Sequence, residues 1–532
     1  MSATKAPAGS HREGAGPPPA STSLAELISA AAVRDPGAVA LASGGRQLTF
    51  AELDRAVGAM ADELLDRGVR RGDAIAVLAG NGLEFPVLAH AVLRARAVLV
   101  PISPSSPAPE ITGLLHAARV EMVLTDRRLE AVAQESATMY DSNCGAVTLD
   151  ASAARSRGDR LALASLAAGP TPAPPPRLKP GAAAVILFTS GSTTHPKGVV
   201  HSHEGLFRNA LCVVSEMTSL SRNDVMLGAL PMAHSFGFSA VLNASLLAGA
   251  RLELMDHFDA GEAWQLVKTR GVTVLSGVPA MYRRLAAAPE ATRNTDLRLA
   301  VVSGSACPRD VARQVRLRMG VGVIERYGMT EASPLTWREV SDETPAGDVG
   351  WPGWGIDVRV VGDSGKVVAA ETSGELEVQA PGMLLRYLRA DDNRHGFRDG
   401  WLRTGDFGRI RKDGGITIES RLKEIILRGG YSISALEVEQ VLAQHRAVQD
   451  AAVVGVPDPD IGEELAAAVV WREGSTAETE DLERFMARRL AGWKRPRLWR
   501  VVDEIPRTPL GKVKREVIAG FWTDGSGRDT KP

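Results

Sequence analysis

The amino-acid sequence predicts an α/β protein: a large N-terminal domain of α/β subdomains with an additional β subdomain, followed by a small mobile α+β C-terminal domain. Three observations support this prediction. Short apolar runs alternate with stretches of helical periodicity from residue 24 to residue 302, as strands and helices do in α/β folds. The 532 residues exceed what one hydrophobic core usually organises. About 110 residues remain after residue 422, enough for a separate domain.

The first elements follow a helix-then-strand order. Apolar spacing predicts a helix over residues 24–33, a short strand over 38–41 and a helix over 49–67. Further short apolar runs, bounded by polar residues, Gly or Pro, predict buried parallel strands covered by helices on both faces; these runs are 74–78, 98–102, 122–124 and 184–189. Residues 1–23, rich in Ala, Gly, Pro and Ser, are expected to be a disordered lead-in.

The middle of the chain predicts a second α/β region and then a β subdomain. The proline-rich residues 169–180 are expected to form a surface connection, because proline removes a backbone donor and restricts its neighbour. The second region is predicted from apolar runs at 225–254, 272–275 and 299–302. After Gly374, short strands are expected between Gly/Asp turns.

The C-terminal domain is predicted from its own alternation of elements. We expect helices over 435–444 and 478–490 and strands over 451–456 and 466–471. The predicted domain limits are therefore 24–422 and 423–532.

Composition excludes several classes of function. Lys and Arg number 62 and Asp and Glu 63, for a net charge of -1, so a basic field for nucleic acid or an anionic membrane is not expected. The cysteines lie far apart and form no CxxC pair, which disfavours zinc sites and disulfides. No apolar run approaches the ~18–20 residues of a membrane span. A cytoplasmic monomer or homodimer is expected.

A hydroxyl-rich segment follows the strand predicted at 184–189. It can bind a polyphosphate, because successive backbone N–H groups and hydroxyls donate to phosphate oxygens, glycine permits close approach, and a lysine supplies positive charge. It is not a Walker loop, since Gly198 follows Lys197. The alternative is a Ser/Thr-rich surface loop. The candidate phosphate-binding residues are Thr189, Ser190, Gly191, Ser192, Thr193, Thr194 and Lys197.

This segment resembles the phosphate loop of the ANL adenylate-forming superfamily, whose other motifs follow in order over residues 24–517. Arg326 to Glu331 resembles the YGxTE motif, and the resemblance implies that Arg326, Tyr327, Gly328 and Met329 contact the nucleotide. The resemblance implies that Glu331 holds Mg²⁺, that Thr330 contacts the phosphates and that Tyr327 lies against adenine. A carboxylate is a hard ligand suited to Mg²⁺, and an aromatic ring offers a stacking face.

Three further motifs resemble the family in the last third of the chain. Trp401 to Asp406 is similar to WxxTGD, which implies that Asp406 accepts from both ribose hydroxyls. The segment 421–426 resembles the hinge, with Arg421 near the ribose and phosphate and Lys423 as the pivot. Residues 506–515 resemble the motif of the catalytic lysine, here Lys512, an ammonium that stabilises negative charge in the transition state. Glu424, Lys514 and Arg515 are expected to be ordinary solvated charges.

Weaker resemblances complete the predicted site. Gly304, Ser305 and Ala306 resemble the adenine-side loop. His234 lies where the family has a histidine beside the carboxylate being activated, although a role in the pocket wall stays equally open. Gly429 and Gly430 lie where thioester-forming members admit the pantetheine arm.

The resemblance implies an acyl-CoA synthetase that uses ATP, Mg²⁺ and CoA, with a small carboxylic acid as its other substrate. Residues 232–239 contain no aspartate to pair with an ammonium group, so an α-amino acid is disfavoured. By family position, the pocket residues indicate an aromatic, alicyclic or medium-to-long acyl group rather than acetate; they are His234, Phe236, Val278, Met281, Gly304, Gly328 and Met329.

One departure from the family pattern lies in the phosphate loop. Thr194 replaces the usual glycine, and a β-branched residue at a position with positive φ costs on the order of 1–2 kcal/mol. Impaired adenylation, with thioester formation from a preformed adenylate, is therefore an alternative function. Transfer to an acceptor other than CoA, a luciferase-like oxygenase and a non-catalytic binding protein on this fold are further alternatives.

Overall fold

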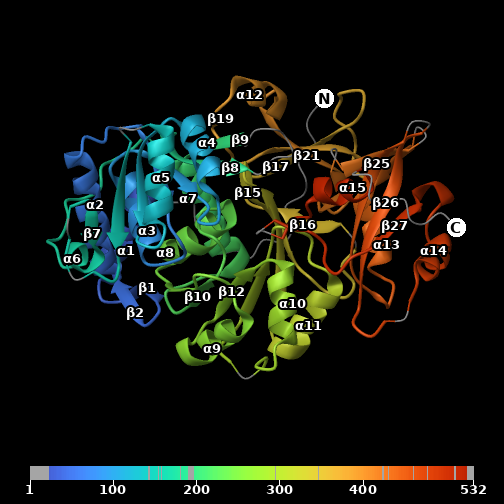
Figure 1. Ribbon diagram of the computed structural model, residues 1–532, viewed down its shortest axis with the longest axis horizontal. Helices are drawn as coiled ribbons and strands as arrows, with labels where there is room; N and C mark the ends of the chain where they lie inside the picture. Colours follow the sequence, from blue (N-terminus) through green and yellow to red (C-terminus); the bar gives the residue numbers. More distant parts are fainter. Residues whose placement is uncertain are drawn as a thin grey trace.

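The computed structural model describes residues 23–141, 144–153, 155–156, 158–179, 181–189, 197–293, 295–345, 347–421, 424–428, 431–458, 461–475, 477–508 and 511–523. Three parts follow one another along the longest axis (Figure 1): an α/β part in blue and cyan, a central part in green and yellow, and a C-terminal part in orange and red. Within the described residues, no helix combines the length and apolarity needed to cross a membrane.

The first sheet has the strand order β19-β9-β8-β4-β3-β5-β6-β7. Its central strands are parallel, and β8 and β9 pair antiparallel. The strands are β3 (Ala74–Leu78), β4 (Val98–Ile102), β5 (Val120–Asp126), β6 (Gly145–Asp150), β7 (Arg160–Ala162), β8 (Ala183–Thr189), β9 (Lys197–Ser202) and β19 (Arg386–Tyr387). The accompanying helices are α2 (Phe50–Asp66), α3 (Glu84–Arg94), α4 (Ala108–Ala118), α5 (Glu130–Tyr140) and α6 (Leu163–Ala167).

The second sheet joins a parallel half to an antiparallel half at β14 (Val323–Met329). The parallel half holds β11 (Arg251–Leu254), β10 (Val225–Gly228), β12 (Val274–Gly277), β13 (Leu299–Val302) and the N-terminal β1 (Val39–Ser43), which pairs with β2 (Arg46–Thr49). The antiparallel half holds β15 (Ala332–Glu339), β16 (Asp348–Pro352), β17 (Asp357–Val361), β18 (Gly374–Gln379), β20 (Phe397–Arg398), β21 (Trp401–Ile410) and β22 (Ile416–Arg421).

The largest hydrophobic core lies between these two sheets, where helices from both halves of the N-terminal domain pack together. Phe50 and Phe85 from one side and Phe238 from the other are fully buried in it. The remaining helices of the domain are η1 (Leu24–Glu26), α1 (Leu27–Arg34), α7 (His203–Cys212), η2 (Val213–Thr218), η3 (Phe236–Asn243), α8 (Ala244–Ala248), α9 (Ala260–Arg270), α10 (Pro279–Ala287), α11 (Arg309–Met319) and α12 (Ala390–Gly396).

The C-terminal part has its own sheet, in the order β24-β23-β26-β25 with β27 beside β26. One core covers each face of this sheet, one with α13 and α14 and the other with α15. The elements are β23 (Ile425–Arg428), β24 (Tyr431–Ser434), α13 (Ala435–Leu442), β25 (Val448–Asp458), β26 (Gly462–Trp471), α14 (Thr479–Ala487), η5 (Gly492–Lys494), β27 (Leu498–Val501) and α15 (Arg515–Thr523).

The predicted fold class is confirmed, and several elements match closely. The strands predicted at 74–78 and 98–102 have those limits in the structure. The helix predicted over 49–67 begins after Thr49, because the Thr49 hydroxyl and the Glu52 carboxylate form a capping box. Residues 1–22 of the predicted lead-in 1–23 lie outside the described residues. The prediction is wrong for Ser23, which is buried and caps η1 because its hydroxyl accepts from the Ala25 N–H.

Candidate active site

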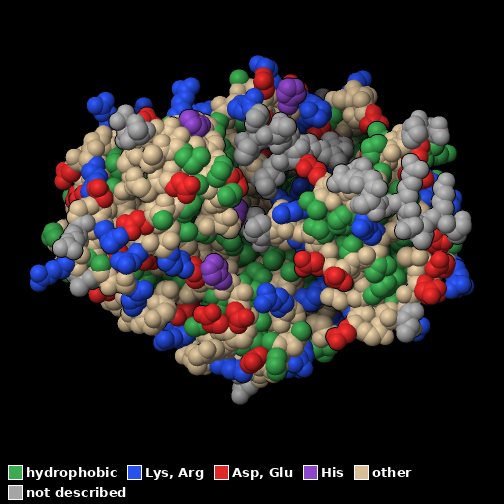
Figure 2. Space-filling model, in the orientation of Figure 1, with side chains coloured by type: hydrophobic (Ala, Val, Ile, Leu, Met, Phe, Trp, Pro, Cys, Tyr) green, Lys and Arg blue, Asp and Glu red, His purple; other side chains and the backbone are tan. Residues whose placement is uncertain are grey.

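Chemically active side chains from distant parts of the chain meet beside the C-terminal end of β14. They come from the β14–β15 turn, from β21 and β22, from the segment before η3, and from the last turn before α15. Figure 2 shows the surface hollowed between the N-terminal part and the C-terminal part, with Lys or Arg side chains along the rim. Such a cleft at strand ends is the usual ligand site of an open α/β sheet.

The β14–β15 turn holds Thr330 and Glu331 in place through three hydrogen bonds. Tyr387 Oη donates to Glu331 Oε1 at 3.0 Å, and the Leu384 backbone N–H donates to the Glu331 carbonyl at 2.7 Å. His201 Nε2 donates to the Thr330 carbonyl at 2.8 Å. Burial lowers the pKa of His201 to about 4, so this histidine is a neutral donor at pH 7. The carboxylate of Glu331 is therefore held buried, with limited freedom.

Tyr387 also joins this turn to Lys197. The Lys197 ammonium lies 5.3 Å from the centroid of the Tyr387 ring and 3.6 Å from Asp392 Oδ1. Thr189 and Lys197 are directly opposite each other on β8 and β9, so both ends of the predicted phosphate loop are fixed beside the β14–β15 turn. The loop residues Ser190, Gly191, Ser192, Thr193 and Thr194 lie outside the described residues.

Asp406 is the centre of a second cluster, formed by β14, β21 and β22. Tyr327 Oη donates to Asp406 Oδ2 at 2.5 Å, and Arg421 Nε lies 3.1 Å from Asp406 Oδ1. The register of the sheet places Asp406 directly opposite Arg421. Burial raises the pKa of Asp406, while Arg421 and Tyr327 oppose that rise. Each carboxylate oxygen keeps acceptor capacity for a further donor, such as a sugar hydroxyl.

The loop after β13 is fastened to β14 at both ends. The Ser303 hydroxyl donates to the Arg326 carbonyl at 3.0 Å, and the Cys307 backbone N–H donates to Glu325 Oε1 at 2.7 Å. Between these two bonds Gly304, with φ of 90°, Ser305 and Ala306 are exposed. Two fixed ends and an exposed middle suit a loop that contacts a planar ligand.

Lys512 reaches the same cleft from the C-terminal part. Desolvation and the charge of Arg421 lower the pKa of Lys512, whereas Glu331 and Asp406 raise it. The Lys512 ammonium also affects His234. Burial is the larger cause of the lowered pKa of His234, and the positive charge of Lys512 lowers that pKa further. The structure therefore brings the ammonium, both carboxylates and the imidazole into one electrostatic environment.

The backbone around Lys512 is held by a tight turn. The Thr508 N–H donates to the Lys512 carbonyl at 2.7 Å, and the Lys512 N–H donates to the Thr508 hydroxyl at 3.2 Å. Arg507 binds both oxygens of Asp450, at 2.9 and 2.8 Å, which fastens the turn to β25. A methyl group on Gly511 would lie 3.8 Å from the Val278 side chain. The turn thus touches the wall of the acid pocket that the sequence predicts.

The donor set fits a magnesium ion that is shared with phosphates. No cluster of three or more His, Cys, Asp or Glu side chains that could hold a metal occurs within the described residues. Glu331 is a single buried carboxylate beside Lys197 and Tyr387. Mg²⁺ commonly uses one or two carboxylates together with substrate phosphates and water, which is the arrangement that this site allows.

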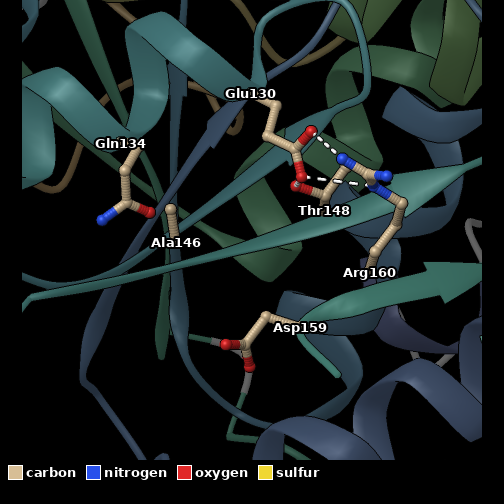
Figure 3. Close-up of a pocket in the computed structure, with 6 residues that line it drawn as sticks. All are labelled: Glu130, Gln134, Ala146, Thr148, Asp159 and Arg160. Carbon is tan, nitrogen blue, oxygen red and sulfur yellow. Dashed lines mark hydrogen bonds and ion pairs between the residues drawn. The ribbon is translucent and has the colours of Figure 1, made fainter. Parts of the chain in front are cut away.

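A polar pocket on the first sheet is a poorer candidate. Glu130, Gln134, Ala146, Thr148, Asp159 and Arg160 line it (Figure 3). Glu130 accepts from Arg160 Nη2, from Arg160 Nε at 3.3 Å and from the Thr148 hydroxyl at 2.9 Å. Because these charges already neutralise each other, the pocket offers little to a charged ligand.

Most described residues that the sequence predicts for the site do meet in this cleft. Those that meet are Lys197, His234, Thr330, Glu331, Tyr327, Asp406, Arg421 and Lys512. Arg326 differs, because its side chain lies on the opposite face of β14 from Tyr327 and touches Phe236 and Ser333. Lys423, Gly429 and Gly430 lie outside the described residues. Sequence reasoning missed Tyr387 and His201, which belong to no motif.

Known protein families match most of the chain. Residues 28–388 match the AMP-binding enzyme family, and residues 437–512 match the AMP-binding enzyme C-terminal domain.

Similar proteins cover nearly the full length. A feruloyl-CoA synthase of Amycolatopsis sp is 34% identical over 496 residues, which cover 91% of this chain and 96% of that protein. An oxalate–CoA ligase of Arabidopsis thaliana is 32% identical, over 95% of this chain and 99% of that one. The crystal structure of ATP-bound MatB from Rhodopseudomonas palustris matches with a TM-score of 0.85 at 30% identity, over 94% of this chain and 99% of that chain.

Proposed function

The chain belongs to the AMP-binding enzyme family, in its acid–CoA ligase branch, and we propose that it activates a carboxylic acid larger than acetate and joins it to CoA. The observation that carries the proposal is the position of Lys512. Lys512 lies in the electrostatic environment of Glu331, Asp406 and Arg421, and its neighbour Gly511 approaches Val278. This arrangement supports the adenylating half of the reaction.

The nucleotide occupies the face of β14 that carries Tyr327. Asp406 accepts from the ribose hydroxyls, and the Tyr327 ring and the loop of Gly304 to Ala306 face the adenine. Lys197 and Thr330 would contact the phosphates, and the Glu331 carboxylate would coordinate the Mg²⁺. The metal supplies charge neutralisation to the phosphate oxygens. Tyr387 keeps the Glu331 carboxylate oriented by donating to Oε1.

In the first step, a carboxylate oxygen of the acid attacks the α-phosphorus of ATP and pyrophosphate leaves. Negative charge grows on the oxygens around that phosphorus, and the Lys512 ammonium stabilises it. Desolvation lowers the pKa of Lys512, and the same partly desolvated setting strengthens its interaction with an anion. His234 has a lowered pKa, so it is a neutral imidazole that can donate to the acid at pH 7.

In the second step, the thiol of CoA attacks the carbonyl carbon of the adenylate, a thioester bond forms and AMP leaves with the bonding electrons. We infer that residues 423–532 turn about Lys423 between the steps, which removes Lys512 and brings Gly429 and Gly430 to the pantetheine arm. Hydrogen bonds between the two parts are contacts that such a hinge motion can exchange. Arg283 Nη1 donates to the Gln449 carbonyl at 3.4 Å, and Ser434 Oγ to the Glu419 carbonyl at 2.6 Å.

The body of the acid lies against the wall formed by Phe236, Val278 and Met281. An aromatic, alicyclic or medium-to-long acyl group fits these apolar side chains, with Gly304, Gly328 and Met329 as further residues of the proposed pocket. The similar proteins do not specify the acid, since enzymes that act on ferulate and on oxalate are almost equally identical to this chain.

The decisive experiment separates the two half-reactions. Acid-dependent exchange of pyrophosphate into ATP reports adenylation, and consumption of CoA with a preformed acyl-adenylate reports transfer. Lys512→Ala should lower exchange by about 100-fold or more and leave transfer largely intact, with Lys514→Ala as the control. Absence of exchange in the wild type across a broad panel of acids would refute adenylation, and unconsumed CoA would indicate a different acceptor.

A further inference from the structure

One buried cation of the site has no counter-charge. Arg326 lies on β14, and only 3% of its surface is exposed. Its neighbour Tyr327 points to Asp406 on the nucleotide side. Because adjacent side chains of a strand alternate between faces, the Arg326 guanidinium lies on the opposite face. There its Cζ is 4.6 Å from the centroid of the Phe236 ring.

The guanidinium of Arg326 has unused donors. Nη2 donates to the Ser333 hydroxyl. Nε and Nη1 are buried and have no hydrogen-bond partner within the described residues. Burial lowers the pKa of Arg326 to about 10, and Cys212 opposes this shift, so the side chain is a cation at pH 7. No carboxylate of the described residues pairs with it.

Other arginines of this protein that are buried or partly buried are compensated. Arg94 pairs with Asp54 at 2.8 Å, Arg338 pairs with Asp348, and Arg515 pairs with Glu439 at 2.6 Å. A buried charge without a partner is strongly destabilising, and arginine cannot escape by losing its proton. The exception at Arg326 therefore indicates that an anion from outside the chain completes the site.

The contacts of Arg326 place that anion beside the acid. Phe236 lies two residues after His234, and Ser333 lies two residues after Glu331. Gly328 is on the same face of the strand, and a methyl group there would lie 3.0 Å from Ser333 Oγ and 3.2 Å from the Ala332 carbonyl. The glycine therefore lets the β14–β15 turn close tightly, which holds Ser333 beside the guanidinium.

We propose that the acid carries a second anionic group, a carboxylate or a sulfonate, which the unpaired guanidinium of Arg326 binds while the first carboxylate is adenylated. This inference rests on the proposed function and deepens it. A carboxylate forms charge-assisted hydrogen bonds with arginine, and several N–H donors are free to make them. The apolar body of the acid then spans from Phe236 to Val278, between its two charged ends.

The test uses pairs of acids that differ only in the second charge. Succinate and butyrate, glutarate and valerate, and phthalate and 2-methylbenzoate replace a carboxylate by a methyl group, and 3-sulfopropionate tests a sulfonate. Thioester formation is measured for the wild type, Arg326→Leu, Arg326→Lys and the control Arg127→Leu, an exposed arginine of the first sheet.

For at least one pair, the wild type should prefer the doubly charged acid by about tenfold or more in kcat/KM, the effect of one charge-assisted hydrogen bond. Arg326→Leu should abolish that preference through KM and leave the singly charged acid unaffected or improved. Arg326→Lys should retain part of the preference, and Arg127→Leu all of it. Equal losses on both acids of every pair, or a wild-type preference for the singly charged acids throughout, would overturn the proposal.

Thermal unfolding of the same proteins keeps this inference distinct from the proposed function. A doubly charged acid should raise the Tm of the wild type and not that of Arg326→Leu, whether or not catalysis occurs. Pyrophosphate exchange with butyrate but not succinate would uphold the ligase and overturn the role of Arg326. No exchange with any acid, together with an Arg326-dependent rise in Tm, would uphold the role of Arg326 and overturn the ligase function. Should Arg326→Leu fail to fold, Arg326→Lys decides, because it keeps the charge and loses the planar fork.

Discussion

Replacing Tyr387 by Phe tests how the fold orients the Glu331 carboxylate. The substitution removes the hydroxyl that donates to Glu331 Oε1 at 3.0 Å and keeps the ring, which is buried and lies 5.3 Å from the Lys197 ammonium. A hydrogen bond to a charged group contributes about 1.5–3 kcal/mol. If half or more of this free energy serves the orientation of Glu331, kcat/KM for ATP falls by roughly 4- to 150-fold, and the half-maximal rate requires a higher Mg²⁺ concentration.

The assay is pyrophosphate exchange over a range of Mg²⁺ concentrations. Tyr282→Phe is a matched control, since Tyr282 is also buried and its hydroxyl donates to the Leu275 and Val301 carbonyls, at 2.8 and 3.0 Å. Both variants should lose stability, and only Tyr387→Phe should change the Mg²⁺ dependence. An unaltered Mg²⁺ dependence in Tyr387→Phe would refute the assignment of Glu331 as the metal ligand that Tyr387 orients.

Three further predictions concern the loop, the ribose and pH. Thr194→Gly should raise exchange about 5- to 30-fold if Thr194 strains the phosphate loop, and an unchanged rate would remove impaired adenylation as an alternative. Asp406→Asn should raise the KM for ATP about tenfold and reduce the discrimination against dATP; retained discrimination would exclude a ribose contact. Burial lowers the pKa of His90, His201 and His203 to about 4, so the unfolded chain binds more protons below about pH 6.5. Stability should fall as pH decreases from about 6.5 to 4, by up to about 3 kcal/mol per histidine, and His201→Gln should flatten the pH dependence of Tm; an unchanged slope would contradict this.

The sequence predicts the buried parallel strands well because burial on both faces leaves a continuous apolar run between polar or Gly/Pro breaks. The apolar run at 74–78 has the same limits as strand β3. By contrast, β5 extends from Val120 to Asp126 and β25 from Val448 to Asp458, beyond the runs at 122–124 and 451–456. Backbone pairing continues there through polar residues such as Asp126 and Asp450, which periodicity alone does not identify.

Site residues that belong to sequence motifs could be predicted from the sequence. Site residues whose position depends on tertiary contacts could not. Asp406 and Arg421 belong to separate motifs, and the register of β21 and β22 brings them together. Tyr387 comes from a two-residue strand at the edge of the first sheet, far from Glu331 in sequence. The assignment of Arg326 to the nucleotide followed from its place in a motif. No strand was predicted there, so the alternation of faces could not be applied.

Adjacent side chains of β14 point to opposite faces of the strand, so the nucleotide contacts and the proposed acid contacts lie on different faces. Tyr327 and Asp406 are coupled by a hydrogen bond on one face, and Arg326, Gly328 and Ser333 meet on the other. If Arg326 binds the acid as proposed, a substitution there changes the charge offered to the acid without moving the ribose contacts, because the two side chains share only the backbone. If that independence holds, Arg326→Leu alters the KM for the acid and leaves the KM for ATP unchanged.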